Sequence, residues 1–146
     1  MLVKSKNYKA VYHRKWGTEK IYYLSHSLSN AGWNKLSYLF KYLNLLVFRC
    51  FIPPEAVIGD RLDLPHGGFG VVIHKNTHIG DDAIIFHNVT IAEGGAIIGD
   101  RVYIGTGAVI IGSVTIGSDV KIGANCIVNF DVPSNTTVVS PIASIK

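Results

Sequence analysis

The sequence predicts an all-β fold, a parallel β-helix with three short strands in each coil, preceded by a short α-helical segment. Three observations predict it. Apolar residues recur every six positions in the second part of the chain, glycine follows many of them, and the residues before the repeat have helical spacing instead. We therefore expect a helical segment over residues 1–50 that caps one end, and a β-helix over residues 51–146.

The six-residue repeat is carried mainly by isoleucine. A period of six fits neither an α-helix nor a simple alternating strand. It fits a triangular coil closed by three hexapeptides, in which each apolar residue stacks on the one three repeats later and fills an interior column. The repeated positions are Ile73, Ile79, Ile85 and Ile91 and then, after a slip of one residue, Ile98, Ile104, Ile110, Ile116, Ile122 and Val128.

Glycine and small polar residues stand where such a coil must turn its corners. The residue after the repeated apolar position is glycine at Gly80, Gly99, Gly105, Gly117 and Gly123. Sharp corners need residues that tolerate unusual backbone angles, and glycine does so at no steric cost. The repeat therefore carries its own turn signals.

Two helices are expected before the repeat. Apolar residues at helical spacing lead to a stop at residues 30–32 (NAG), and a second apolar stripe leads to Pro53 and Pro54, which terminate it. The second stripe consists of Leu36, Leu39, Phe40, Leu43, Leu46 and Val47. We expect this stripe to pack on the neighbouring helix and to cap the β-helix. Contact of these helices with a membrane surface is the less favoured alternative.

Composition and charge exclude several classes of protein. A chain of 146 residues with 48% hydrophobic and 16% charged residues predicts one compact domain. The most apolar stretch, residues 33–52, carries three basic residues, which argues against a membrane span, and no secretory signal is visible at the start. The formal charge of +4 comes largely from Lys4, Lys6, Lys9, Arg14, Lys15 and Lys20, which we interpret as a solvated leader and not as a nucleic-acid site.

Cysteine usage points to a reducing compartment. Cys50 and Cys126 lie far apart and form neither a zinc-knuckle spacing nor a disulfide framework, so we expect a cytoplasmic protein.

The motifs that carry chemistry are residues 64–73 (LPHGGFGVVI), 86–91 (FHNVTI), 98–100 (IGD) and 131–139 (DVPSNTTVV). In these motifs the chain resembles the hexapeptide acyltransferases, most closely the serine acetyltransferases and their short relatives of surface-polysaccharide synthesis. The resemblance implies a left-handed β-helix that forms a homotrimer with active sites between subunits. It also implies transfer of an acetyl group from acetyl-CoA, the co-substrate, to a hydroxyl of L-serine or of a sugar.

The chain also departs from the family pattern. Pro65 and Phe51 stand where serine acetyltransferases have acidic residues, and the long loop that carries their serine-recognition residues is reduced to residues 92–95 (AEGG). The tail, residues 138–145, lacks the usual ending of the family as well. Serine recognition is therefore the least supported part of the resemblance.

His66 is the expected general base. It lies where the six-residue register breaks, since Ile58 and Ile73 are fifteen residues apart instead of twelve or eighteen, so its loop should bulge from the coil. Base catalysis needs an imidazole within reach of the acceptor hydroxyl. The adjacent Gly67 and Gly68 let the backbone approach a substrate closely and offer N–H groups to an oxyanion, as does Gly70.

His87 is the second expected catalytic residue. It follows His66 by 21 residues, one 18-residue coil plus three inserted residues, so both can lie on the same side of neighbouring coils. It would orient the acceptor, assist the base or line the cofactor cleft; the alternative is a corner histidine hydrogen-bonded to backbone. Asn88 and Glu93 are candidate substrate-binding neighbours, with Glu93 a candidate orienter of an imidazole across a subunit boundary.

The resemblance places acetyl-CoA along small residues of the coil, at Gly105, Ala108 and Gly123, with Lys121 for phosphate. Tight coil corners require the same small residues, so both interpretations stay open.

Two other functions compete: a catalytically silent trimeric scaffold, and a metal-dependent hydratase like the β-helical carbonic anhydrases, with His74, His78 and His87 as ligands. No metal is expected, because His74 and His78 should lie around different corners or faces of the coil. His13 and His26 are expected to be structural.

Overall fold

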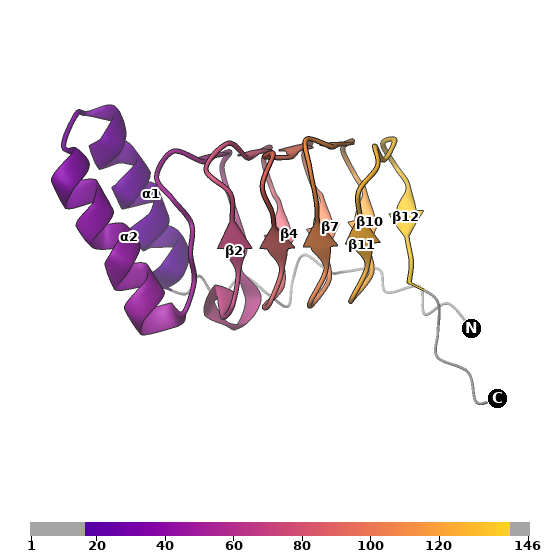
Figure 1. The fold of residues 1–146 in the computed structure, drawn as a ribbon, viewed down its shortest axis with the longest axis horizontal. Coiled ribbons are helices and arrows are strands. Elements are labelled where there is room, and N and C mark those ends of the chain that lie inside the picture. The colour runs from indigo at the N-terminus through magenta and orange to yellow at the C-terminus, as the bar shows by residue number, and fades with distance from the viewer. Residues whose placement is uncertain (1–16, 141–146) are drawn as a thin grey trace.

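The computed structural model of the protein describes residues 17–140. Two helices, α1 (Gly17–Asn30) and α2 (Asn34–Phe48), lie at one end of a coil of two-residue strands, as Figure 1 shows. The predictions for the basic residues of the first sixteen positions, for His13 and for the tail after residue 140 lie outside the described residues. No helix among residues 17–140 has the length and apolar character needed to cross a membrane.

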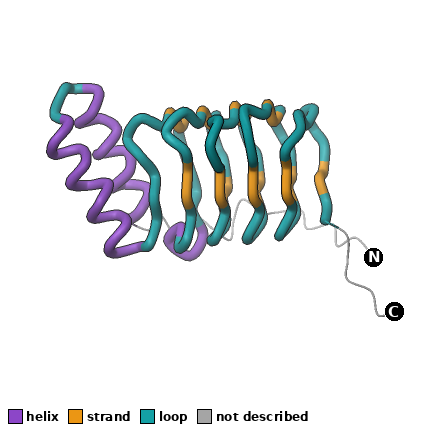
Figure 2. The backbone as a smooth tube through the Cα atoms, viewed as in Figure 1, coloured by secondary structure: helices purple, strands orange, loops and turns teal. Residues whose placement is uncertain are grey.

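The strands form three parallel sheets of four strands each. The first is β1 (Val57–Ile58), β3 (His78–Ile79), β6 (Ile97–Ile98) and β9 (Thr115–Ile116); the second is β2 (Val72–Ile73), β5 (Thr90–Ile91), β8 (Val109–Ile110) and β11 (Ile127–Val128); the third is β4 (Ile84–Ile85), β7 (Tyr103–Ile104), β10 (Lys121–Ile122) and β12 (Thr137–Val138). Successive strands in the chain belong to different sheets, so each coil visits all three faces (Figure 2).

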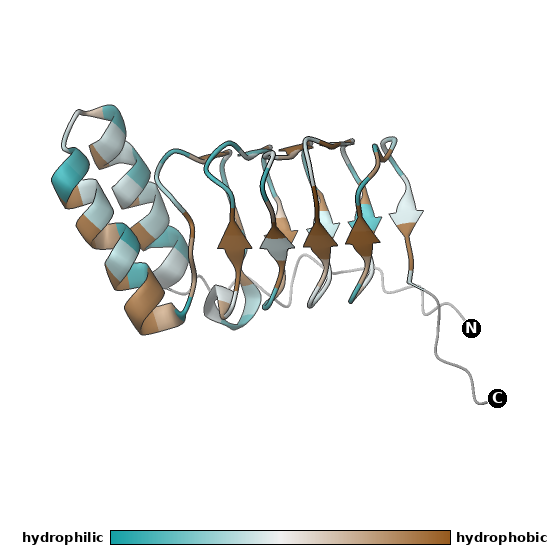
Figure 3. Ribbon diagram, in the orientation of Figure 1, coloured by the Kyte–Doolittle hydropathy of each residue, from teal (hydrophilic) through white to brown (hydrophobic). Residues whose placement is uncertain are grey.

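The register of the sheets confirms the predicted stacking. Ile98 pairs with Ile116, and Ile91 with Ile110, in parallel ladders. The repeated isoleucines point inward, and most are fully buried, while the residue before each of them faces outward. Figure 3 shows hydrophobic residues along several of the strands, whereas others, such as β12, are pale. A single coil has no interior of its own, so this column is stable only because neighbouring coils cover each other.

Helix α1 is tied to the first coil by side chains that donate to backbone carbonyls. The hydroxyl of Tyr22 donates to Ala56 at 2.7 Å, and the hydroxyl of Tyr23 donates to Gly59 at 2.5 Å. His26 Nδ1 lies 2.7 Å from the carbonyl oxygen of Pro54, which confirms the structural role predicted for this histidine. These bonds fix α1 across the open end of the interior column.

Helix α2 does not bury the apolar stripe that the sequence shows. Its buried residues are polar: Ser37, Lys41 and Asn44. The hydroxyl of Ser37 donates to the carbonyl oxygen of Ser25 on α1, whereas Leu39 is 61% exposed and Leu46 is 75% exposed. The expected packing of this stripe on α1 is therefore wrong.

The end of α2 also differs from the expectation. The helix stops at Phe48, before Pro53 and Pro54, because Arg49 takes the left-handed conformation and its N–H donates to the carbonyl oxygen of Leu45.

Candidate functional site

The site lies along one corner of the coil, which we call the histidine edge: the residues between the β4-containing sheet and the β2-containing sheet. Its successive turns are residues 65–71, 86–89, 105–108 and 123–126. Backbone bonds join these turns, since Asn88 donates to Phe69 at 2.8 Å, Gly107 to His87 at 3.2 Å and Asn125 to Thr106 at 2.9 Å. The edge is thus a continuous ridge of stacked turns.

The His66 loop, residues 65–70, is the enlarged turn at the helical end of this edge. Leu64 and Ile73 both point into the core, nine residues apart where a regular corner takes six. His66 has φ of 60°, and Gly67 and Gly68 have φ of 73° and 65°. Three consecutive left-handed residues turn the chain outward, and the His66 side chain is exposed. The predicted bulge is confirmed.

Helix α1 holds the His66 loop from behind. The hydroxyl of Thr18 donates to the carbonyl oxygen of Gly67 at 2.7 Å, and Glu19 Oε1 accepts from the N–H of Leu64 at 3.0 Å. Both side chains are buried, Thr18 at 0% and Glu19 at 2% exposure. A hydroxyl and a carboxylate in the first turn of a helix read as ordinary N-terminal residues, so sequence reasoning missed their role in placing His66.

His66 and His87 lie side by side, as their spacing predicts. Their ring centroids are 5.1 Å apart with the planes nearly perpendicular, at 86°. Nδ1 of His87 is buried and has no hydrogen-bond partner among residues 17–140. The backbone hydrogen bond of a purely structural corner histidine is therefore not made at this nitrogen. A buried ring nitrogen without a partner is costly unless a ligand or water satisfies it.

The glycines of the loop are packed and bonded within the chain. The N–H of Gly67 donates to Leu64 and that of Gly70 donates to Arg49, both at 3.0 Å, so two of the three amides expected to meet an oxyanion already donate within the chain. Gly68 lies against Cys50, whose Sγ would be 3.2 Å from an added Cβ. Gly70 lies against Asn88, whose Oδ1 would be 2.1 Å from one.

The candidate cofactor residues occupy the same edge. The turn at residues 105–108 contains Gly105 and Ala108, and the turn at residues 123–126 contains Gly123. Lys121 is an exposed residue of β10, next to the second of these turns. An added Cβ at Gly105 would lie 2.7 Å from the backbone nitrogen of Ala124, and Ala108 is fully buried. Coil stacking thus explains why these positions are small.

Glu93 lies on another corner, between β5 and β6, and the single chain does not bring it to the histidines. It contributes instead to a cavity of about 330 Å³ beside α2, whose lining includes Tyr38, Lys41, Phe51 and His74. A role for Glu93 at His66 therefore requires a neighbouring subunit.

The histidines considered as metal ligands do not converge. His74 and His78 flank one turn between β2 and β3, whereas His87 lies on the histidine edge. Across residues 17–140, no three His, Cys, Asp or Glu side chains form a group that could hold a metal ion.

The two cysteine thiols are not positioned to act as nucleophiles. Burial, with a smaller contribution from the nearby Glu19 carboxylate, raises the pKa of Cys50 to about 12. Cys126 is buried as well, and both cysteines are free. Neither thiol is in an accessible position, and the raised pKa keeps Cys50 protonated at neutral pH.

Comparison with known proteins gives the family. The family model described as bacterial transferase hexapeptide (six repeats) matches residues 95–129. The chain is 38% identical over 125 residues to a serine acetyltransferase of Helicobacter pylori, covering 81% of this chain and 72% of that protein. It is 37% identical over 125 residues to the putative colanic acid biosynthesis acetyltransferase WcaB of Escherichia coli, covering 82% and 76%.

Solved structures agree with this result. The serine acetyltransferase of Neisseria gonorrhoeae in complex with serine superposes with a TM-score of 0.78 at 36% identity, covering 88% of this chain and 55% of that one. A serine acetyltransferase in complex with CoA superposes with a TM-score of 0.75 at 30% identity, covering 82% and 51%. The chain spans about half the length of these two structures. The chain belongs to the hexapeptide-repeat acyltransferases, as a left-handed β-helix related to the serine acetyltransferases and to WcaB.

Proposed function

We propose that the protein is an O-acetyltransferase that moves the acetyl group of acetyl-CoA to a hydroxyl of a small acceptor, with His66 as the general base. The observation that carries the proposal is the exposed imidazole of His66 beside His87, on an edge whose turns at residues 105–108 and 123–126 consist mainly of small residues. Two relatives with this chemistry in their names cover most of the chain.

The reaction needs two proton transfers and one displacement at the thioester carbon. His66 takes the proton of the acceptor hydroxyl while its oxygen attacks the thioester carbon of acetyl-CoA. The tetrahedral intermediate then collapses, the carbon–sulfur bond breaks, and the CoA thiolate takes a proton from the imidazolium. An acetyl ester and free CoA are the products, and His66 is restored.

Direct transfer is favoured over an acetyl-enzyme. Covalent catalysis needs an activated nucleophile at the site. Cys50 lies behind Gly68 with a raised pKa, and the reaction does not require it.

Acetyl-CoA would lie along the histidine edge, with its pantetheine arm past Gly105, Ala108 and Gly123 and its phosphates near Lys121. This placement brings the thioester toward His66 and leaves His87 beside it, where Nδ1 can bond to a substrate. We propose a homotrimer, in which Glu93 of one subunit faces the histidine edge of the next and Asn88 contacts the acceptor.

We propose a sugar hydroxyl of surface-polysaccharide synthesis as the acceptor. Phe51 is a half-buried side chain of the first coil and Pro65 is buried, so neither supplies the charge that would hold a small zwitterion. L-serine is the second candidate, because the Neisseria gonorrhoeae relative was solved with serine. The free state of both cysteines is consistent with a cytoplasmic reaction.

Thiol release from acetyl-CoA, measured with a panel of nucleotide sugars, free sugars and L-serine, tests the function. We expect turnover that depends on one class of hydroxyl acceptor, with an acetyl ester identified by mass spectrometry. Binding of acetyl-CoA without turnover on any member of the panel would contradict the enzyme and favour the silent scaffold.

A further inference from the structure

Helix α2 presents an apolar face to the outside of the molecule, which we call the α2 apolar face. Its members are Trp33, Leu36, Tyr38, Leu39, Tyr42, Leu43, Leu46 and Val47, and their exposed fractions run from 37% at Leu36 and Tyr38 to 75% at Leu46. Figure 3 shows hydrophobic residues along α2, most continuously toward its C-terminal end. A contiguous exposed face of this kind is expected to contact a partner or a membrane.

The apolar face points outward because the opposite side of α2 packs against α1. Ser25 and Ser37 bond to each other across the two helices, and Asn44 Nδ2 donates to the carbonyl oxygen of Thr18. Thr18 in turn donates to Gly67 in the His66 loop. Rotating α2 to bury its leucines would break these buried polar bonds. The exposure of the apolar face is therefore built into the packing of the hairpin.

The charges around the face are mainly positive, with Glu55 as an acidic exception whose carboxylate accepts a hydrogen bond from the Tyr38 hydroxyl. Between Glu19 and Glu55 the sequence has four basic residues and no acidic one. Lys20, Lys35 and Arg49 are exposed at the ends of the hairpin. Lys41 is buried, with its Nζ 4.2 Å from the ring centroid of Tyr38. A face of apolar and aromatic residues with a net positive charge around it complements an anionic surface.

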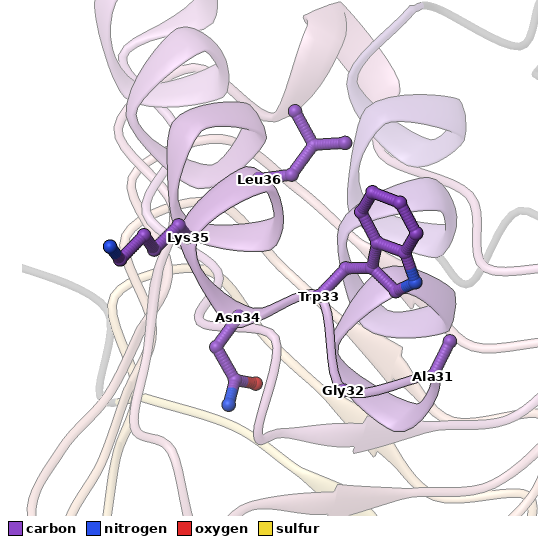
Figure 4. Close-up of a pocket in the computed structure, with 6 residues that line it drawn as sticks. All are labelled: Ala31, Gly32, Trp33, Asn34, Lys35 and Leu36. Carbon is purple, nitrogen blue, oxygen red and sulfur yellow. The ribbon is translucent and has the colours of Figure 1, made fainter.

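The tip of the hairpin has the same character. Trp33 is 65% exposed at the turn between the helices, next to a hollow of about 520 Å³ lined by residues 31–36. In Figure 4 the Lys35 side chain extends away from Trp33 and Leu36, so the cation and the apolar side chains leave the turn in different directions. Trp and Tyr are the residue types that concentrate at membrane–water boundaries.

We propose that the α2 apolar face binds the surface of an anionic lipid bilayer, with α2 lying in the interface and Lys20, Lys35 and Arg49 at the phosphate level. Pairing of two copies through this face would bring together two surfaces of net positive charge, whereas anionic headgroups neutralise that charge. The interaction does not depend on the acetyl-transfer activity.

Vesicle flotation of the purified full chain tests the proposal. We expect binding to vesicles made of equal parts phosphatidylglycerol and phosphatidylcholine, weakening as salt is raised, and little binding to phosphatidylcholine alone. Leu46→Glu should lower the bound fraction about tenfold, because it removes an exposed leucine that the bilayer would bury and adds a negative charge. Val139→Glu is the matched control, since Val139 is 73% exposed at the other end of the molecule, and should leave binding unchanged.

Two measurements distinguish the alternatives. Light scattering without lipid gives the oligomeric mass, and circular dichroism shows that both variants are folded. A lower mass for Leu46→Glu than for wild type and Val139→Glu would assign the face to a contact between subunits and overturn the proposal. Equal binding of wild type to neutral and anionic vesicles, or no binding to either, would overturn it as well.

Discussion

Two corners of the coil interrupt the six-residue period between Ile58 and Val128, and they differ in what the extra residues do. The His66 loop projects an exposed imidazole and is bonded from behind by Thr18 and Glu19. The turn at residues 92–96 is compressed onto its neighbours, since an added Cβ at Gly95 would lie 2.5 Å from the carbonyl oxygen of Asn76. An insertion therefore marks a site when it projects a reactive side chain and is supported from outside the coil.

The largest expected difference between the corners is in catalysis. His66→Asn, which keeps a residue tolerant of the left-handed conformation, should lower kcat by about a hundred- to ten-thousand-fold, because the base is lost. His78→Ala, an exposed histidine near the other corner, should leave kcat within about twofold of wild type. Steady-state thiol release with the identified acceptor measures both. Equal losses of kcat in the two variants would contradict a catalytic difference between the two corners.

The second expected difference is in stability. Gly95→Ala places a Cβ against backbone at φ of 70° and should lower the free energy of unfolding by about 3 kcal/mol. Gly70→Ala meets the movable end of the Asn88 side chain and should cost about 1–2 kcal/mol. Urea unfolding of both variants gives the comparison. A larger cost at Gly70 would mean that the His66 loop is the more tightly packed corner.

The third expected effect concerns the support of the His66 loop. Thr18→Val removes the bond to Gly67 at nearly constant volume and should cost about 1–2 kcal/mol of stability while lowering kcat about tenfold, with KM for acetyl-CoA nearly unchanged. Thr115→Val, at an exposed threonine of β9, is the matched control. Loss of stability with full kcat would show that α1 supports the fold and not the placement of His66.

A further expected effect, seen only at alkaline pH, is the pH dependence of stability at the same corner. The pKa of Cys50 is raised by burial from 9.0 to about 12, so its contribution is fully present below pH 9. Above pH 9 the unfolded chain loses a proton that the folded chain keeps, and the free energy of unfolding falls by about 1.4 kcal/mol per pH unit. Cys50→Ala should show a shallower alkaline decline in urea unfolding. An unchanged slope would assign the decline to other groups, such as Tyr22, whose pKa is also raised by burial.

Local pattern was sufficient to predict the coil. A period of six with glycine at the corners predicts three faces, and the pairing of Ile79 with Ile98 confirms it. The spacing of 21 residues between His66 and His87 was sufficient to place them on one edge, because the coil fixes the distance between equivalent turns. Repetition makes contacts predictable that are remote in an ordinary domain.

The helices show where the pattern stops being informative. Spacing shows that α2 has an apolar face but not what covers it, and here Ser37 and Asn44 decided which face was buried. The bonds of Thr18 and Glu19 to the His66 loop join segments more than forty residues apart with no repeat between them. Such pairs become neighbours only in the folded structure, so a sequence pattern does not predict their contacts.

Chemical rescue of the base tests the central claim most directly. His66→Gly keeps the left-handed conformation and opens a space where the imidazole stood. We predict that added imidazole restores formation of the acetylated acceptor in this variant, in proportion to its concentration, and has no such effect on Thr18→Val. Acetyl-CoA binding that persists in His66→Gly, with no restoration of acceptor acetylation by imidazole, would contradict the assignment of His66 as the base.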